Sequence, residues 1–322
     1  NHGWDAARWG YRPGGDPKDS FEPLEVGEAD GSTPAPAKPR LRLDGKPLGK
    51  GALTAQRYDP PQSLLDGLVP CAPFTLVGEG GIGKSTFTLA LMIHVILGRE
   101  LWSREVRFPG PAVLVTAEDD RQTALWRLQS ICEAMGLDQT EREAVEQGFH
   151  VEDMTRHGIG ARLAELDRSG NVTEGQLVQA AVDAYGPVKP SLLLFDPLSY
   201  FGPGENHMND GAAALMQALW KVSHALDRAA VGVVHHTGQE AARSGTDDQY
   251  AGRGGSALAD NARGVLVLKR VKAREDGSLP SGLPPAATAE QIEQGKAVSV
   301  NVAKNSFGPL PGRKLFMLRD VD

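Results

Sequence analysis

Short apolar runs alternate with helical patterns along the chain from about residue 58 to residue 322. Uninterrupted apolar runs of this length are typical of strands that are buried on both faces of a parallel sheet. The runs that predict such strands lie at 74–77, 112–115, 192–195, 231–234 and 265–268. Two later runs, 298–302 and 315–318, predict an antiparallel pair of strands towards the C-terminus.

Apolar residues at intervals of three and four predict helices at 86–97, 122–135 and 211–227. The apolar faces of the last two helices are Leu125, Leu128, Cys132 and Met135, and Leu215, Leu219, Val222 and Leu226. Strands that alternate with helices indicate an α/β fold in which helices flank a mostly parallel central sheet. The antiparallel pair would complete this sheet at its C-terminal side.

The first 57 residues lack this alternation. The segment 30–50 is rich in Gly, Pro, Ala, Lys and Arg and has no apolar period, which favours a flexible, extended N-terminal tail. We therefore predict a tail or linker at 1–57, or the end of a preceding domain, followed by a folded domain at 58–322. Within that domain, 273–295 is a polar insertion with a short helical piece at 288–294, and a hairpin turns at 167–171.

Charge and cysteine content narrow the class of protein. A formal net charge of −7 and a pI near 5.7 exclude a protein coated in basic surface for nucleic acid, although a basic stripe inside a ring or groove is compatible with them. Cys71 and Cys132 are too few for a disulfide or zinc framework, which favours a reducing, cytoplasmic environment. The longest apolar stretch, 87–97, contains His94 and is too short to cross a membrane.

The octapeptide after the first predicted strand carries the strongest chemical signal. It fits the phosphate-loop pattern G-x-x-x-x-G-K-[ST] and stands between a strand and a helix. Together with the threonine that follows, its residues are Gly78, Glu79, Gly80, Gly81, Ile82, Gly83, Lys84, Ser85 and Thr86. Backbone N–H groups and the helix N-terminus would hold the phosphates of ATP, Lys84 would reach the β- and γ-phosphates, and Ser85 would bind Mg²⁺. The alternative, a glycine turn without a ligand, leaves the Gly-Lys-Ser-Thr ending unexplained.

Two carboxylates stand at the ends of predicted strands. Asp196 follows the run 192–195 in the form of a Walker B acid and would ligate Mg²⁺; alternatively it caps the next turn. Glu118 follows the run 112–115, and because we place that strand beside the phosphate-loop strand, we predict Glu118 as the general base. Its alternative role is the acidic start of the next helix.

Histidines and arginines follow the later strands. Either His235 or His236 would hydrogen-bond to the γ-phosphate or to the attacking water, whereas a zinc site at this pair lacks further ligands at suitable spacing. Arg253 and Arg263 are candidate arginine fingers for the γ-phosphate of a neighbouring subunit, or surface arginines in local ion pairs. The basic run Lys269, Arg270, Lys272 and Arg274 fits a solvated strand edge better than a phosphate contact.

Taken in order, these motifs resemble the RepA-like hexameric replicative helicases, a RecA-fold branch of the P-loop ATPases. The segments that carry the resemblance are 78–85, 117–120, 195–198, 205–206, 235–236, 253–263 and 304–308. The resemblance implies a RecA-like ATPase domain at 58–322, hexameric rings, ATP and Mg²⁺ as cofactors, and movement on single-stranded DNA. It also implies that the histidine pair senses the nucleotide, that Arg263 is the finger with Arg253 near it, and that Lys304 lies close to a subunit boundary. Residues 3–7 are faintly similar to the end of a primase-type domain, to which such ATPases are sometimes fused.

We therefore expect an ATP-dependent DNA helicase or translocase that acts in the replication of plasmid, phage or mobile-element DNA. An alternative is a RecA-fold ATPase that drives a regulatory or recombination assembly without unwinding. A structural module that only binds nucleotide is a third hypothesis, but Glu118 and Asp196 argue against it because binding alone requires no group that positions water.

Overall fold

The computed structural model describes residues 45–55, 57–157, 161–203, 208–238, 247–252, 257–274, 276, 278–285, 287–311 and 315–319. The chain divides into two units, Asn1–Arg57 and Tyr58–Asp322. In the first unit, residues 50–55 form turns, and Leu48 and Leu53 expose their side chains. Most of the predicted tail lies outside the described residues, so its flexibility and the domain boundary stay predictions.

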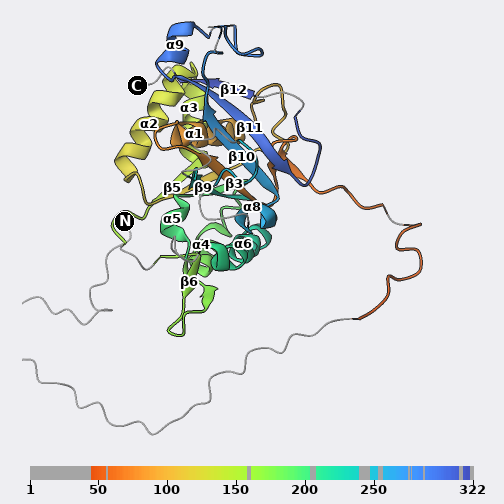
Figure 1. Ribbon diagram of the computed structural model, residues 1–322. Helices are drawn as coiled ribbons and strands as arrows, with labels where there is room; N and C mark the ends of the chain where they lie inside the picture. Colours follow the sequence, from red (N-terminus) through yellow and green to blue (C-terminus); the bar gives the residue numbers. More distant parts are fainter. Residues whose placement is uncertain are drawn as a thin grey trace, which may run out of the picture. The chain divides into compact units, whose positions relative to one another are not determined.

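The second unit is built on an eight-stranded sheet with the strand order β12-β11-β10-β3-β9-β8-β4-β5 (Figure 1). Its strands are β3 (Pro73–Gly78), β4 (Ala112–Thr116), β5 (Phe149–Asp153), β8 (Leu192–Asp196), β9 (Ala230–His236), β10 (Gly264–Arg270), β11 (Ala297–Asn305) and β12 (Leu315–Leu318). The strands from β10 to β5 run parallel, whereas β11 and β12 run antiparallel to their neighbours. The predicted fold class, a mostly parallel sheet with antiparallel C-terminal strands, is confirmed.

Helices cover both faces of this sheet. The longer ones are α1 (Lys84–Leu97), α2 (Arg121–Ala134), α3 (Gln139–Gly148), α4 (Leu177–Tyr185) and α6 (Met208–Ala225). The shorter elements are α5 (Leu198–Phe201), α8 (Ala257–Asn261), α9 (Ala289–Glu293) and the hairpins β1 (Ser63–Leu65) with β2 (Val69–Pro70) and β6 (Ala164–Leu166) with β7 (Val172–Glu174). Among the described residues, every helix is too short or too polar to cross a membrane.

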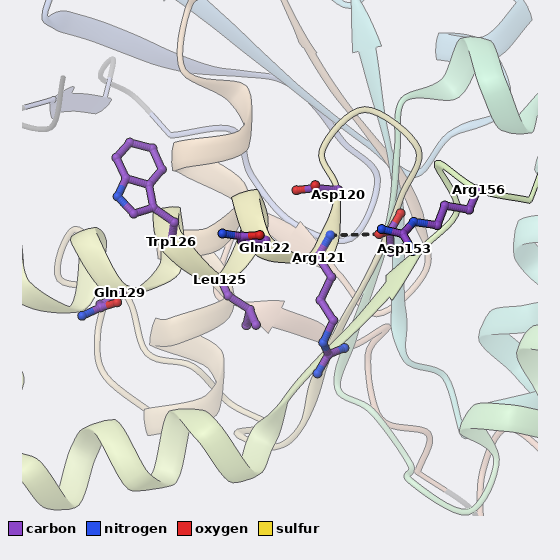
Figure 2. Close-up of a pocket in the computed structure, with 8 residues that line it drawn as sticks. All are labelled: Asp120, Arg121, Gln122, Leu125, Trp126, Gln129, Asp153 and Arg156. Carbon is purple, nitrogen blue, oxygen red and sulfur yellow. Dashed lines mark hydrogen bonds between the residues drawn. The ribbon is translucent and has the colours of Figure 1, made fainter.

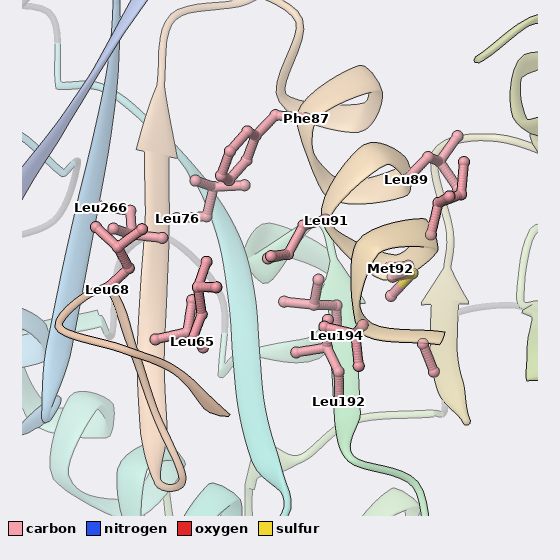
Figure 3. Close-up of a cluster of buried hydrophobic side chains, with 14 of the residues drawn as sticks. Leu65, Leu68, Leu76, Phe87, Leu89, Leu91, Met92, Leu192, Leu194 and Leu266 are labelled. Carbon is pink, nitrogen blue, oxygen red and sulfur yellow. The ribbon is translucent and has the colours of Figure 1, made fainter. Parts of the chain in front are cut away.

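Alternating strand residues build two separate cores, because successive side chains of a strand point to opposite faces. On one face, Leu76, Leu194 and Leu266 pack with Phe87 and Leu91 of α1 (Figure 3), and the same core takes in side chains of α2 and α3. The opposite face packs against α4, α5, α6 and α8. Each buried leucine or phenylalanine contributes about 1.5–3 kcal/mol. The helix that follows the phosphate loop is therefore fixed firmly to the sheet.

The predicted apolar face of α2 is wrong at one position. Leu128 and Cys132 are buried as predicted, but Leu125 is 40% exposed and Ala124 is buried in its place. The helix turns residues 124, 128, 131 and 132 inwards, and Leu125 lies at the margin of that face, about 100° on from Ala124. Figure 2 shows Leu125 and the neighbouring Trp126 beside a surface hollow at the start of this helix.

The connection from 135 to 189 contains elements that we did not predict. The helix α3 buries only Val145, so it has almost no apolar periodicity, although Asp138 and Glu141 form a capping box at its start. The edge strand β5 is short and mostly polar, and α4 follows the β6–β7 hairpin. That hairpin and the short helix at 288–294 are confirmed.

Candidate functional site

The phosphate-loop residues lie at the carboxyl end of β3, where the chain turns directly into α1. Gly81 and Gly83 have φ angles of 68° and 99°, which glycine adopts without strain. Gly83 caps α1 without a side-chain hydrogen bond, and the first turn of the helix contains no acidic residue. The first N–H groups of α1 therefore present a positive helix end to an anion. Ile82 is buried, so it offers the loop only its backbone.

Lys84 is folded back onto the loop. Its Nζ atom donates hydrogen bonds to the carbonyl oxygens of Gly78 (3.0 Å) and Glu79 (2.9 Å). Burial lowers the pKa of Lys84, whereas the charges of Asp196, Glu118 and Glu79 oppose that change. The lysine is thus held above the loop within the field of both predicted carboxylates.

Asp196 ends β8 and is 4% exposed. Its Oδ1 atom is buried without a hydrogen-bond partner in the described part of the chain. Burial, and secondarily the charge of Glu118, raises the pKa of Asp196 to about 7. A buried carboxylate oxygen without a partner is costly, so such an atom marks a place for a cation or a proton.

The residues present fit Mg²⁺. Asp196 offers an oxygen with a free coordination position, and Ser85 stands in the first turn of α1 as the second oxygen ligand. In the described ranges, no group of three or more His, Cys, Asp and Glu side chains could hold a metal ion. An ion bound here would therefore complete its shell with phosphate oxygens and water, as Mg²⁺ does at nucleotide sites.

Glu118 lies at the end of β4, but β4 is not the neighbour of the phosphate-loop strand. The prediction that placed these two strands side by side is wrong, because β9 and β8 lie between them. Glu118 still lies near the loop, because Thr116 pairs with Asp196 in register and the N–H of Ala117 donates to the carbonyl of Asp196 (2.8 Å). The strands β4 and β8 therefore end at the same position in the sheet, which brings Glu118 close to Asp196.

The two acids after Glu118 have structural contacts. Asp119 pairs with Arg127 (3.3 Å), and Asp120 caps α2 by accepting a hydrogen bond from the N–H of Thr123 (2.8 Å). The helix-start role that was the alternative for Glu118 therefore belongs to Asp120. The structure gives the exposed carboxylate of Glu118 no hydrogen bond or ion pair among the described residues, which leaves it available to water near the loop.

The two histidines at the end of β9 face in opposite directions, since successive strand residues alternate. His236 Nδ1 lies 3.4 Å from Lys84 Nζ, so this ring borders the phosphate loop. His235 is buried, and a methyl group placed on Gly252 would lie 3.0 Å from its Cδ2 atom. The histidine that reaches the lysine of the loop is therefore His236, while His235 packs beneath the segment around Gly252.

The arginine that was predicted as a finger lies at the opposite end of the parallel strands from the phosphate loop. Arg263 directly precedes β10. The first residue of β10, Gly264, pairs with Phe74 near the start of β3, whereas Gly78, at the end of β3 where the phosphate loop begins, pairs with a residue near the end of β10. Its guanidinium carbon lies 5.8 Å from the ring centroid of Trp220. Arg253 and residues 205–206 lie outside the described residues. Arg263 therefore does not reach the loop of its own chain.

Lys304 lies at the same edge as Arg263. It is level with Val265, and its Nζ atom donates to the carbonyl oxygens of Ala259 (2.7 Å) and Asp260 (2.8 Å), which close the end of α8. Burial lowers the pKa of Lys304. In this structure the lysine thus stabilises the short helix beside Arg263.

Sequence reasoning missed one residue at the site, Arg319. It follows β12, and its Nη1 atom donates to the carbonyl oxygen of Gly81 (3.0 Å). A methyl group placed on Gly83 would lie 2.6 Å from Arg319 Cδ, so the arginine occupies the space beside this glycine. Its Nε atom is buried without a hydrogen-bond partner in the described part of the chain. No local pattern could have revealed this contact, because it joins residues 238 positions apart.

Trp102 holds the C-terminal strand against α1. Its Nε1 atom donates to the carbonyl oxygen of Phe316 (2.9 Å) in β12, and its ring stacks on Phe87 of α1 at 6.0 Å between centroids. The strand that carries Arg319 is therefore anchored to the helix that the phosphate loop begins.

A protein-family model described as an AAA domain matches residues 38–242, which is more than half of the chain. The match contains the phosphate loop, Glu118, Asp196 and both histidines. It ends before Arg263 and the C-terminal strands.

The buried carboxylate generates a prediction about pH. Because the pKa of Asp196 is raised from 3.8 to about 7, the folded protein binds more protons than the unfolded chain between these values. Without metal and nucleotide, the free energy of unfolding should therefore fall as pH rises from about 4 to about 7. The variant Asp196→Asn should lose this dependence and be more stable than the wild type at pH 8. The gain should be a few kcal/mol at most, since one pKa unit corresponds to about 1.4 kcal/mol.

Urea unfolding in EDTA at several pH values measures this difference. A stability difference between the two proteins that stays constant from pH 4 to pH 8 would contradict the raised pKa of Asp196.

Arg319 should matter for nucleotide binding as a positioning residue. Arg319→Ala removes a charged hydrogen bond that restrains the loop, and such bonds contribute about 1.5–3 kcal/mol. We expect roughly ten-fold weaker binding of a fluorescent ATP analogue and a higher KM, with a smaller change in kcat. Arg168→Ala, which removes an exposed arginine from the turn between β6 and β7, serves as the control. Equal affinities of the Arg319 variant and the wild type would exclude the role.

Proposed function

The chain belongs to the AAA domain family, and we propose that this ATPase is a DNA helicase or translocase of the RepA-like type that acts in DNA replication. The observation that carries the proposal is the convergence of side chains from separate strands at the phosphate loop. Lys84, Asp196 and Glu118 interact electrostatically, and His236 contacts Lys84. This arrangement exceeds what a module that only binds nucleotide requires.

Each residue would have a distinct part in hydrolysis. The loop N–H groups bind the phosphates, and Lys84 exchanges the carbonyl oxygens of Gly78 and Glu79 for phosphate oxygens. Ser85 and Asp196 would hold Mg²⁺, which supplies neutralisation of the phosphate charge when it is bound. Glu118 orients the attacking water and accepts its proton. His236 lies beside Lys84, so a change at the γ-phosphate displaces its ring and is transmitted along β9.

The position of Arg263 supports action between subunits. Because this arginine lies at the sheet edge away from its own loop, only a second copy of the chain could present it to the γ-phosphate. A hexameric ring is the assembly that we propose, in line with the oligomeric habit of the family. Leu125 and Trp126, which are 40% and 56% exposed on α2, are candidates for a contact surface.

The remaining partners follow from the same proposal. Single-stranded DNA is the proposed track, and a primase-type domain is proposed as a fused or associated partner because residues 3–7 resemble the end of such a domain.

We place the protein in the cytoplasm, which agrees with the presence of both Cys71 and Cys132 as free thiols. The formal net charge of −7 favours the second candidate, an ATPase that drives a regulatory or recombination assembly without unwinding.

The ATPase rate with and without single-stranded DNA tests the proposal. We expect DNA to stimulate the wild type, and Glu118→Gln to retain ATP binding while its rate falls by about 10²–10⁴-fold. In native mass measurement with ATP, the particle should weigh six times the 34.3-kDa chain. ATP turnover without stimulation and without a ring would favour the regulatory candidate, and undiminished turnover by Glu118→Gln would remove Glu118 as the base.

Mixed assemblies test the arginine finger. Arg263→Ala protein keeps an intact loop and Lys84→Ala protein keeps an intact Arg263, so their mixture should contain some complete interfaces. We expect the mixture to hydrolyse ATP faster than either variant alone. A mixture of Lys84→Ala with Glu118→Gln is the matched control, because both changes damage the same side of the interface. If neither mixture gains activity, Arg263 does not act across subunits.

A further inference from the structure

A basic hollow lies beyond the C-terminal end of β10, outside the nucleotide site. Four cationic residues line it, together with residues of the insertion and of β11 and β12; the lining is Lys269, Arg270, Val271, Lys272, Arg274, Pro280, Ser281, Gly282, Ser299 and Phe316. The hollow has a volume of about 600 Å³, within the range of ligand-binding pockets. None of these lining residues is acidic, although the chain as a whole carries a formal charge of −7.

The floor of this basic hollow is a row across three strands. Lys269 of β10 pairs in register with Ser299 of β11, which pairs with Phe316 of β12, so their side chains share one face of the sheet. The insertion forms the wall, since a methyl group placed on Gly282 would lie 3.5 Å from Phe316 Cε2. Figure 1 shows the segment around α9 beside β11 and β12.

The four cationic residues follow one another within six positions of the chain, and the side chains of Lys269 and Arg270 point to opposite faces of β10, so the four do not face one point. Lys272 and Arg274 stand on a segment without regular structure after β10, and the N–H of Arg274 donates to the carbonyl of Ser278 (2.9 Å) to close its turn. Both side chains are exposed. Positive charges in such a line match successive phosphates of a strand better than the clustered phosphates of one nucleotide, and Phe316 adds an aromatic face for a base.

We propose that the basic hollow binds the sugar–phosphate backbone of a single nucleic-acid strand. This inference rests on the proposed function and adds a contact surface for its DNA that lies on the C-terminal strands. The strand β12, which contributes Phe316 to the hollow, ends at Leu318, and the next residue, Arg319, contacts Gly81 of the phosphate loop. A nucleic-acid strand bound in the hollow is therefore separated from the nucleotide site by no more than the short β-strand β12.

Charge reversal tests the inference. The double variant K272E/R274E should bind a labelled oligothymidylate roughly ten-fold more weakly than the wild type in fluorescence anisotropy. Its plot of log affinity against log salt should be shallower by about 1.4, because each lost phosphate contact on a single strand removes about 0.7. R168E/K189E, which reverses two exposed charges elsewhere, should bind like the wild type. F316L keeps the apolar bulk at the floor but removes the ring, and should weaken binding with little change in the salt slope.

The outcomes separate this inference from the proposed function. If the wild type binds the oligonucleotide and K272E/R274E binds it equally well, the hollow is not the site and the DNA motor remains. If the wild type hydrolyses ATP but binds no oligonucleotide, the DNA-dependent function itself fails and the inference fails with it. If inorganic tripolyphosphate competes as strongly as the oligonucleotide, the hollow binds small phosphates. If polyglutamate competes as strongly, it binds acidic peptides. Either result would overturn the proposal that a nucleic-acid strand binds in the hollow.

Discussion

The nucleotide site depends on one electrostatic constraint, a lysine and a carboxylate buried side by side without a direct bond between them. Lys84 donates hydrogen bonds to two carbonyl oxygens of the loop, whereas Asp196 Oδ1 has no hydrogen-bond partner in the described part of the chain. Burial favours the neutral form of both groups, and the pKa of Asp196 rises to about 7. An arrangement of this kind is poised for a ligand that brings both negative phosphate and positive metal, because each would relieve one of the two groups.

The sheet brings the remaining groups to that pair through strand order and register. Asp196 stands level with Thr116, and His236 stands level with Gly78, so three strands end at the same edge of the sheet as the phosphate loop. The parallel arrangement requires this, since the carboxyl ends of parallel strands meet at one edge. Hydrophobic cores pack against both faces of these strands and so hold the strand order and register that bring the side chains together.

The sequence was sufficient for those parts of the site that depend on local pattern. Strands, the phosphate loop and strand-end carboxylates all follow from short runs of residues, and the strands were found at the predicted positions. Strand order does not follow from local pattern, so Glu118 was placed on a neighbour of β3 when two strands lie between. Side-chain direction at a strand end is also invisible in sequence, which is why His235 and His236 were treated alike. Polar elements such as α3, which buries only Val145, left no apolar period to detect.

Arg319 shows how the last strands complete a site that the first strands begin. The antiparallel pair adds to the sheet at β10, beside β3, and the residue that follows β12 contacts the loop at the end of β3. Glycine at position 83 is needed twice there, for its positive φ and for the space that the arginine fills. A change in the loop conformation on nucleotide binding must therefore either carry Arg319 with it or break its hydrogen bond to Gly81. Trp102 ties β12 to α1. If Arg319 moves with the loop, β12 must move as well; if its hydrogen bond breaks, the charged guanidinium of Arg319 becomes free beside the phosphates. In both cases a change at the loop alters a contact of the C-terminal segment, and a coupling of this kind is what the proposed motor function requires.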